Sequence, residues 1–116
     1  MKFHLDYMPI NWNEYINKER SSYYLANKIK QEEKQIVKYL CRKKYEGNYP
    51  IEITFTIHYK DCRQDLDNFR MKGLIDGLVA NGIIENDNLK KIQKITLIPV
   101  FEGDGVDIEI KEVYGS

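Results

Sequence analysis

The sequence predicts an α+β fold, with a mixed sheet and two helices packed against one face of it. Two observations carry this prediction. Apolar and polar residues alternate over residues 51–59, as in a half-buried strand. Between residues 22 and 45 apolar residues recur at three- and four-residue steps, as on one side of a helix. The remaining segments complete the order β-α-β-α-β-β, without an internal repeat or a linker.

The first half of the chain is expected to contain one strand, one loop and one helix. Residues 2–8 alternate as a strand does, and Pro9 ends that strand. A loop is expected to follow, in which aromatic and basic side chains interleave up to Tyr24. Such a loop either stacks bases and binds phosphates or packs on the core. The helix over residues 22–45 then begins at a serine N-cap and ends before Gly47.

The second half is expected to alternate strand, helix and two strands. After the strand over residues 51–59, Asp67 is expected to be the N-cap of a helix that runs to about Asn81. Gly82 is the expected C′ residue of that helix. A turn over 83–87 leads to strands over 92–101 and 106–113, joined as a hairpin through the glycine-containing loop 102–105.

Composition indicates one globular domain over residues 1–116. The chain is 42% hydrophobic and 31% charged, which is typical of globular proteins. No apolar run approaches the ~20 residues of a membrane span. His4 and Asp6 interrupt the N-terminal segment where a signal peptide needs an apolar core, so cytoplasmic residence is the expected default. Cys41 and Cys62 form neither a disulfide framework nor a zinc set.

The charges of the chain balance to zero but are unevenly distributed. Residues 18–44 hold nine Lys or Arg against three Glu, whereas residues 61–116 hold eleven acidic side chains against seven basic ones. A solvated helix face would explain the basic segment. A basic DNA-binding surface beside an acidic metal pocket would produce the same asymmetry.

The most informative segment comes directly after the strand over residues 51–59. It contains, in order, Arg63-Gln64-Asp65-Leu66-Asp67-Asn68, Lys72, Asp76 and Asn86-Asp87. Mg²⁺ takes oxygen ligands, usually one or two carboxylates plus substrate phosphate, and a metal-dependent phosphodiesterase needs such an acidic cluster. Helix caps and turns are the alternative role for these Asp and Asn residues. An EF-hand is excluded, because Arg70 stands at the loop position that requires glycine.

This ordered set resembles the RusA family of Holliday junction resolvases, whose pattern is roughly D-x-D-N-x-x-K-x-x-x-D-x-L and then an acidic pair. The match is close over residues 63–88 and looser toward both ends. Two departures are present. Three residues separate Asn68 from Lys72 where the family usually has two, and the acidic pair is Asn86-Asp87 here. The second departure indicates Asp87, rather than its neighbour, as the ligand.

The resemblance implies a Mg²⁺-dependent crossover junction endodeoxyribonuclease that acts as a homodimer on four-way junction DNA, with Mn²⁺ as a possible substitute ion. The implied metal ligands and catalytic carboxylates are Asp65, Asp67 and Asp87. Lys72 is the implied catalytic cation, with Arg70 as the alternative. The candidate DNA contacts are Asn13, Lys18, Arg20, Arg63 and Arg70.

Two other functions remain open from the sequence. One is a catalytically inactive module that binds branched DNA, in which the acidic residues act only as caps. The other is a protein-interaction domain that uses the aromatic N-terminal loop. His4 and His58 lie on the polar sides of their strands, and no partner for either is visible in the sequence, so we do not expect them to be catalytic bases.

Overall fold

The computed structural model describes residues 1–60 and 64–114, and its centre is a four-stranded mixed sheet. The strands are β1 (Lys2–Leu5), β2 (Ile51–His58), β3 (Ile92–Val100) and β4 (Gly105–Glu112). Their order across the sheet is β1-β4-β2-β3. β2 runs parallel to β3 and antiparallel to β4, and β4 runs antiparallel to β1. The predicted α+β class with a mixed sheet is confirmed.

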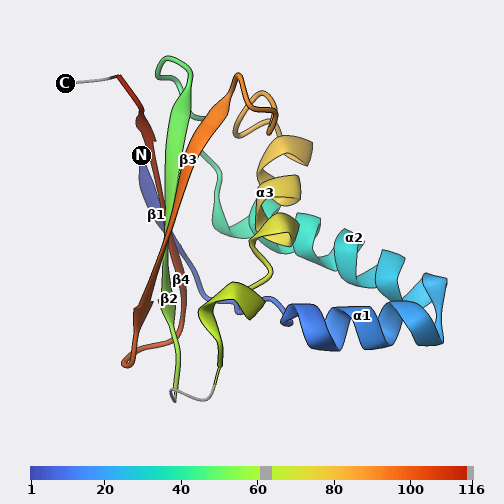
Figure 1. The fold of residues 1–116 in the computed structure, drawn as a ribbon. Coiled ribbons are helices and arrows are strands. Elements are labelled where there is room, and N and C mark those ends of the chain that lie inside the picture. Colours follow the sequence, from blue (N-terminus) through green and yellow to red (C-terminus); the bar gives the residue numbers. More distant parts are fainter. Residues whose placement is uncertain (61–63, 115–116) are drawn as a thin grey trace.

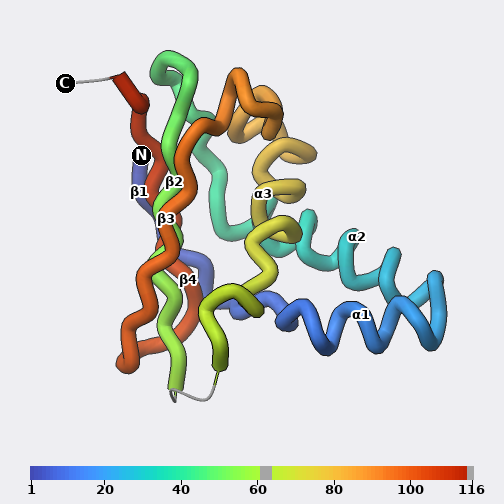
Figure 2. Tube along the Cα trace, viewed as in Figure 1, coloured from blue at the N-terminus to red at the C-terminus, as the bar shows by residue number. Residues whose placement is uncertain are grey.

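The helices of the described residues lie on one face of this sheet (Figure 1). They are α1 (Trp12–Ser21), α2 (Tyr23–Leu40) and α3 (Met71–Ala80), with a short 3₁₀ turn, η1 (Leu66–Asn68), ahead of α3. Helix α3 connects the parallel strands β2 and β3, as a parallel pair requires. Helices α1 and α2 form an antiparallel arm that projects away from the sheet, as the chain trace also shows (Figure 2).

Helix α1 is the main difference from the expected architecture, because residues 12–21 were expected to be a loop. Asn11 caps the helix, accepting a hydrogen bond from the backbone N–H of Glu14 at 2.9 Å. Tyr15 is the one buried residue of α1. A helix that buries so little has no apolar stripe for periodicity to detect. Ser22 ends α1 and caps α2, which fits the expected serine N-cap.

Three expected boundaries were wrong, two of them for reasons of packing. Helix α2 ends at Leu40 rather than near residue 45, because Cys41 is extended and its side chain is buried in the core. β1 ends at Leu5 rather than at residue 8. Asp67 is not the N-cap of α3, because it lies within η1 and two non-helical residues, Phe69 and Arg70, precede the helix. Phe69 is buried against Phe55, with ring centroids 5.7 Å apart, and this contact delays the helix start.

The connection between β3 and β4 is not the expected hairpin. β2 lies between these two strands, so the loop at residues 101–104 crosses the end of β2. Gly103 and Gly105 adopt positive φ angles of 80° and 83°, which confirms the expected use of glycine in this loop. Gly82 has φ of 70° after the Asn81 C-cap, as expected for a C′ residue.

The core lies between the sheet and the helices. It is built from the inward-facing residues of β2 and β4, with Leu74 and Leu78 from α3 packed against them. Helix α3 approaches α2 closely through two glycines. A Cβ atom at Gly77 would lie 2.8 Å from Val37, and one at Gly73 would lie 2.6 Å from the Glu33 carboxylate. These positions tie the segment that carries the acidic motif to the arm.

Among the residues that the structure describes, no helix is both long enough and apolar enough to cross a membrane.

Candidate active site

The acidic motif begins at the carboxyl end of β2. Asp65 and Asp67 are both exposed, and they flank the first residue of η1. Asp65 is the N-cap residue of η1, but its side chain makes no capping hydrogen bond, and neither does that of Arg70 ahead of α3. Helix capping was the alternative explanation for these carboxylates. In the described part of the chain, neither carboxylate makes a capping hydrogen bond at the start of η1 or of α3.

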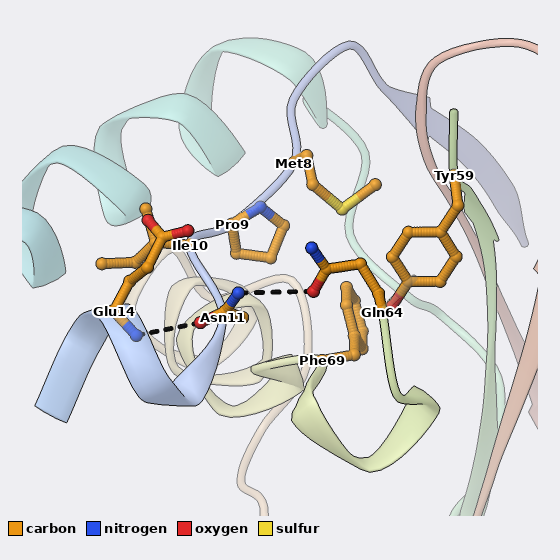
Figure 3. A pocket seen from close by; sticks show the side chains of 8 residues that line it. All are labelled: Met8, Pro9, Ile10, Asn11, Glu14, Tyr59, Gln64 and Phe69. Atoms are coloured by element: carbon orange, nitrogen blue, oxygen red, sulfur yellow. Dashed lines mark hydrogen bonds between the residues drawn. The ribbon is translucent and has the colours of Figure 1, made fainter. Parts of the chain in front are cut away.

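A hollow of about 250 Å³ lies beside this segment (Figure 3). Its walls come from the β1–α1 connection, the end of β2 and η1, and its lining residues are Met8, Pro9, Ile10, Asn11, Glu14, Tyr59, Gln64 and Phe69. The Asn11 amide donates a hydrogen bond to the Gln64 side chain at 3.3 Å (Figure 3). The chain thus joins its N-terminal segment to the residue just before Asp65.

Lys72 lies in the first turn of α3 and is paired with Asp76 one turn further on. The Lys72 Nζ atom is 3.4 Å from Asp76 Oδ1, and both side chains contact solvent. This is the surface pair that i, i+4 spacing favours, and it leaves the ammonium group accessible.

Asp87 comes after α3, in the loop that leads to β3. Asn86 shapes this loop, because its side-chain oxygen accepts hydrogen bonds from the backbone N–H groups of Asp87 at 2.7 Å and Asn88 at 3.3 Å. Asn86 therefore has a local structural function, and the Asp87 side chain is exposed.

Asp87 and Asp76 line one hollow between α2, α3 and the α3–β3 loop. The other charged residues of its lining are Lys30, Lys34 and the buried Glu33. Asp76 belongs to the predicted motif but was not among the predicted metal ligands. The structure makes Asp76, rather than Asp65 or Asp67, the motif carboxylate that shares a hollow with Asp87.

The three predicted metal ligands do not form a closed cluster. Asp65 and Asp67 precede α3 whereas Asp87 comes after it, and a ten-residue helix spans about 15 Å. Within residues 1–60 and 64–114, only His4, His58 and Asp107 bring three potential ligand atoms within 4.8 Å of one another. The carboxylates supply the hard oxygen donors that Mg²⁺ prefers, but the folded chain does not hold all three at one point.

Arg70, a candidate for both DNA contact and the catalytic cation, is buried. Its guanidinium group is ion-paired with Glu33, and Arg70 is 2% and Glu33 1% exposed. Arg70 also donates to the Ile10 carbonyl at 3.2 Å and stacks over the Tyr15 ring at 4.5 Å. In this arrangement the guanidinium holds the arm against the start of α3 and is not presented to a phosphate.

Glu33 is incompletely satisfied in this network. Its Oε1 atom is buried without a hydrogen-bond partner in the described structure. The Tyr7 hydroxyl lies 3.5 Å from Oε2, at the outer limit of a hydrogen bond. Burial, together with the negative charge of Glu33, raises the pKa of Tyr7 far above its usual value, so this hydroxyl stays protonated.

Three of the remaining candidate DNA contacts lie on the arm. Asn13, Lys18 and Arg20 are exposed on α1, and Lys18 and Arg20 stand in its last turn. Arg63 lies outside the described residues. Tyr23 and Tyr24, at the junction of the two helices, are 83% and 72% exposed. Basic and aromatic side chains therefore share the accessible surface of the arm.

A comparison of the chain with protein-family models found no match, and a search of curated proteins also found none.

Proposed function

We propose that this chain is a Mg²⁺-dependent, structure-selective endonuclease that cuts four-way DNA junctions, as its resemblance to the RusA family implies. The observation that carries the proposal is the ordered acidic motif, whose Asp65 and Asp67 are exposed after β2. In the described structure neither side chain makes a capping hydrogen bond at η1 or α3, which favours a role beyond helix capping. Exposed carboxylates, with the accessible Lys72 ammonium group in the following helix, are a suitable donor set for metal and phosphate.

In this proposal Asp65 and Asp67 hold Mg²⁺, and Asp87 contributes from the loop after α3. Mg²⁺ usually keeps several waters and takes one or two protein carboxylates, so a closed cage of three is not required before substrate binds. When bound, the ion supplies an activated water and charge neutralisation for phosphodiester hydrolysis. Lys72, which is exposed and paired with the surface carboxylate of Asp76, contributes a positive charge toward the phosphate.

The arm supplies the DNA contacts in this proposal. Lys18 and Arg20 on α1 bind phosphates, while Lys30 and Lys34 on α2 border the hollow that contains Asp76 and Asp87. The exposed rings of Tyr23 and Tyr24 offer stacking surfaces for unpaired bases at a branch point. A cytoplasmic homodimer, with one active site for each of two strands, matches the twofold symmetry of the junction.

Metal-dependent cutting of a labelled four-way junction tests the proposal. The purified chain is incubated with the junction in Mg²⁺, in Mn²⁺ and in EDTA, and a linear duplex of the same arm sequences serves as the substrate control. We expect paired nicks near the branch point in either metal, none in EDTA and little cutting of the duplex. Junction binding without metal-dependent nicks would contradict the enzyme function.

That contradictory outcome would support the second candidate, an inactive module that binds branched DNA. Two observations favour it. Asp65, Asp67 and Asp87 do not converge in the described structure, and Asn86 stabilises its own loop instead of supplying a carboxylate. If the chain failed to bind any branched DNA at low salt, both candidates would be excluded, and a protein-interaction domain would be favoured.

A further inference from the structure

The outer face of the sheet carries a second polar cluster that the acidic motif does not involve. His4 on β1, Asp107 on β4 and His58 on β2 lie side by side, and we call them the histidine cluster. His4 Nδ1 is 2.6 Å from Asp107 Oδ1, and His58 Nε2 is 2.9 Å from Asp107 Oδ2. These are the only two histidines in the sequence. Their shared partner Asp107 was not visible in the sequence, because it depends on the strand order β1-β4-β2.

The strand order explains why the cluster forms. β4 lies between β1 and β2, and His4 is the direct cross-strand partner of Asp107. His58 pairs with Gly105, two residues before Asp107, so its ring reaches Asp107 on the diagonal. Their chain neighbours Leu5, Ile57 and Val106 are fully buried toward the helices, so the alternation of the strands turns the cluster outward.

The loop that crosses the end of β2 fixes the orientation of His58. The Glu102 carbonyl oxygen lies 2.7 Å from His58 Nδ1. A carbonyl oxygen only accepts hydrogen bonds, so Nδ1 must carry a proton. In a neutral imidazole Nε2 then presents its lone pair toward the Asp107 carboxylate, which is also an acceptor. A proton shared by these two atoms, or a metal ion bound by both of them, removes the conflict.

The same hydrogen bond is a common feature of protein metal sites. A ligating histidine usually donates its other ring N–H to a carbonyl or carboxylate, which fixes the tautomer and the ring plane. The glycines of the crossing loop leave space for this arrangement. A Cβ at Gly103 would lie 3.2 Å from His58 Nδ1, and one at Gly105 would lie 3.1 Å from His4 Nε2 and would collide with the Leu5 carbonyl.

The donor set and its accessibility indicate the class of ion. Two imidazoles and one carboxylate suit Zn²⁺ and neighbouring transition metals, whereas Mg²⁺ takes oxygen ligands. The side chains of His58 and Asp107 are 18% and 26% exposed, and that of His4 is 47% exposed. The sheet therefore covers one side of the three donor groups. Their other side is open to solvent, where water or a further ligand could complete the coordination of an ion.

We propose that His4, His58 and Asp107 form a binding site for Zn²⁺ or a similar transition-metal ion that joins β1, β4 and β2. The site is separate from the carboxylates of the acidic motif and differs from them in ion preference.

Calorimetric titration of the tag-free, EDTA-treated chain with Zn²⁺ tests this inference, together with thermal unfolding at each metal concentration. We expect one ion per chain. At a free Zn²⁺ concentration of about 100 times Kd, the folding equilibrium shifts about 100-fold and Tm rises by roughly 10 °C. Titration with Co²⁺ should produce the visible absorption of a nitrogen- and oxygen-ligated ion.

Three variants decide whether the ion is bound at this cluster. Asp107→Asn and His4→Gln, both partly exposed and close in size to the native residues, should weaken Zn²⁺ binding by roughly 100-fold or more. Asp104 is a neighbouring exposed acid that pairs with Lys60, and the control variant Asp104→Asn should bind Zn²⁺ as tightly as the unmodified chain does. Absence of saturable binding, or equal binding by Asp107→Asn, would overturn the site. If lowering the pH raised Tm while Zn²⁺ left Tm unchanged, the cluster would bind protons rather than a metal ion, and this too would overturn the site.

Discussion

The two polar clusters of this molecule are assembled in opposite ways. Asp65, Asp67, Asp76 and Asp87, here called the carboxylate set, lie within 23 consecutive residues but are spread along η1, α3 and the loop after α3. In the histidine cluster, His4 and Asp107 are more than a hundred residues apart in the sequence. The donor atoms of the cluster nevertheless all lie within 4.8 Å of one another. The carboxylate set is thus close in sequence but spread in space, whereas the histidine cluster is distant in sequence but close in space.

The difference results from the elements that carry the residues. Neighbouring strands are only about 4.8 Å apart, so outward side chains at paired positions lie in contact distance of one another. A helix instead holds the residues at its two ends apart, by about 1.5 Å for each residue of its length. The strands therefore bring their three donor atoms together, whereas the carboxylates of the set do not converge in the described structure. Substitutions in the arm, the carboxylate set and the sheet test this difference.

Breaking the buried pair that anchors the carboxylate set to the arm should have the largest effect on stability. Glu33→Leu leaves the Arg70 guanidinium buried without its partner, and we expect a loss of about 3–5 kcal/mol in the free energy of unfolding. Urea unfolding monitored by circular dichroism measures it. Glu33→Leu combined with Arg70→Met is the control and should recover most of the loss. A loss below about 1 kcal/mol for the single variant would show that the pair does not anchor the arm.

Removing the carboxylate after α3 should separate cutting from binding. Asp87→Asn should lower Mg²⁺-dependent nicking by about 100-fold or more, because a proposed metal ligand is lost, while junction affinity stays the same or increases. Asn86→Asp, in the adjacent position, is the matched control and should keep or raise activity. Near-normal nicking by Asp87→Asn would exclude this residue, and Asp76→Asn, which changes its neighbour in the hollow, would then be the next test.

Neutralising the arm should change the salt dependence of DNA binding. Lys18→Gln with Arg20→Gln should reduce the slope of log affinity against log salt by roughly 1–2, at about 0.9 per duplex phosphate contact. Lys2→Gln with Lys111→Gln removes two exposed charges from the sheet and should leave the slope unchanged. Equal slopes for both double variants, measured by fluorescence anisotropy, would mean that the arm does not lie along the DNA.

The smallest effect on stability is expected at Lys72. Its exposed pair with Asp76 contributes only about 0.3–0.5 kcal/mol, so Lys72→Gln should unfold almost as the unmodified chain does. Nicking should nevertheless fall, because the proposed role of this ammonium group is toward the phosphate. A variant that keeps its full nicking rate in the junction assay would exclude Lys72 as the catalytic cation.

Sequence patterns predicted the sheet better than the arm. The alternation over residues 51–59 is a direct consequence of a strand with one buried face, and all of its inward residues from Ile51 to Ile57 are fully buried. Helix α1 buries only Tyr15, so its sequence contains no periodic signal. Its one local sign was Asn11, which is a common cap residue placed just after Pro9.

The candidate sites show the same limit. The acidic motif is contiguous, so its residue types were visible, but its geometry depends on the length of α3 and on Phe69, whose burial shifts the helix start. The histidine cluster requires the strand order β1-β4-β2, and the sequence instead suggested a β3–β4 hairpin. Arg70 was assigned to DNA because it is charged, and its buried partner Glu33 lies 37 residues earlier in a helix that otherwise is mostly exposed.

Junction cutting by Asp67→Asn, measured beside Asp6→Asn in Mg²⁺, tests the central claim most directly. Asp67 lies in η1 and caps no helix, whereas Asp6 is an exposed acid outside the motif. If Asp67 holds a catalytic ion, Asp67→Asn binds the four-way junction but does not nick it, and Asp6→Asn does both. Equal nicking by the two variants would contradict the assignment of this motif as the metal site of a nuclease.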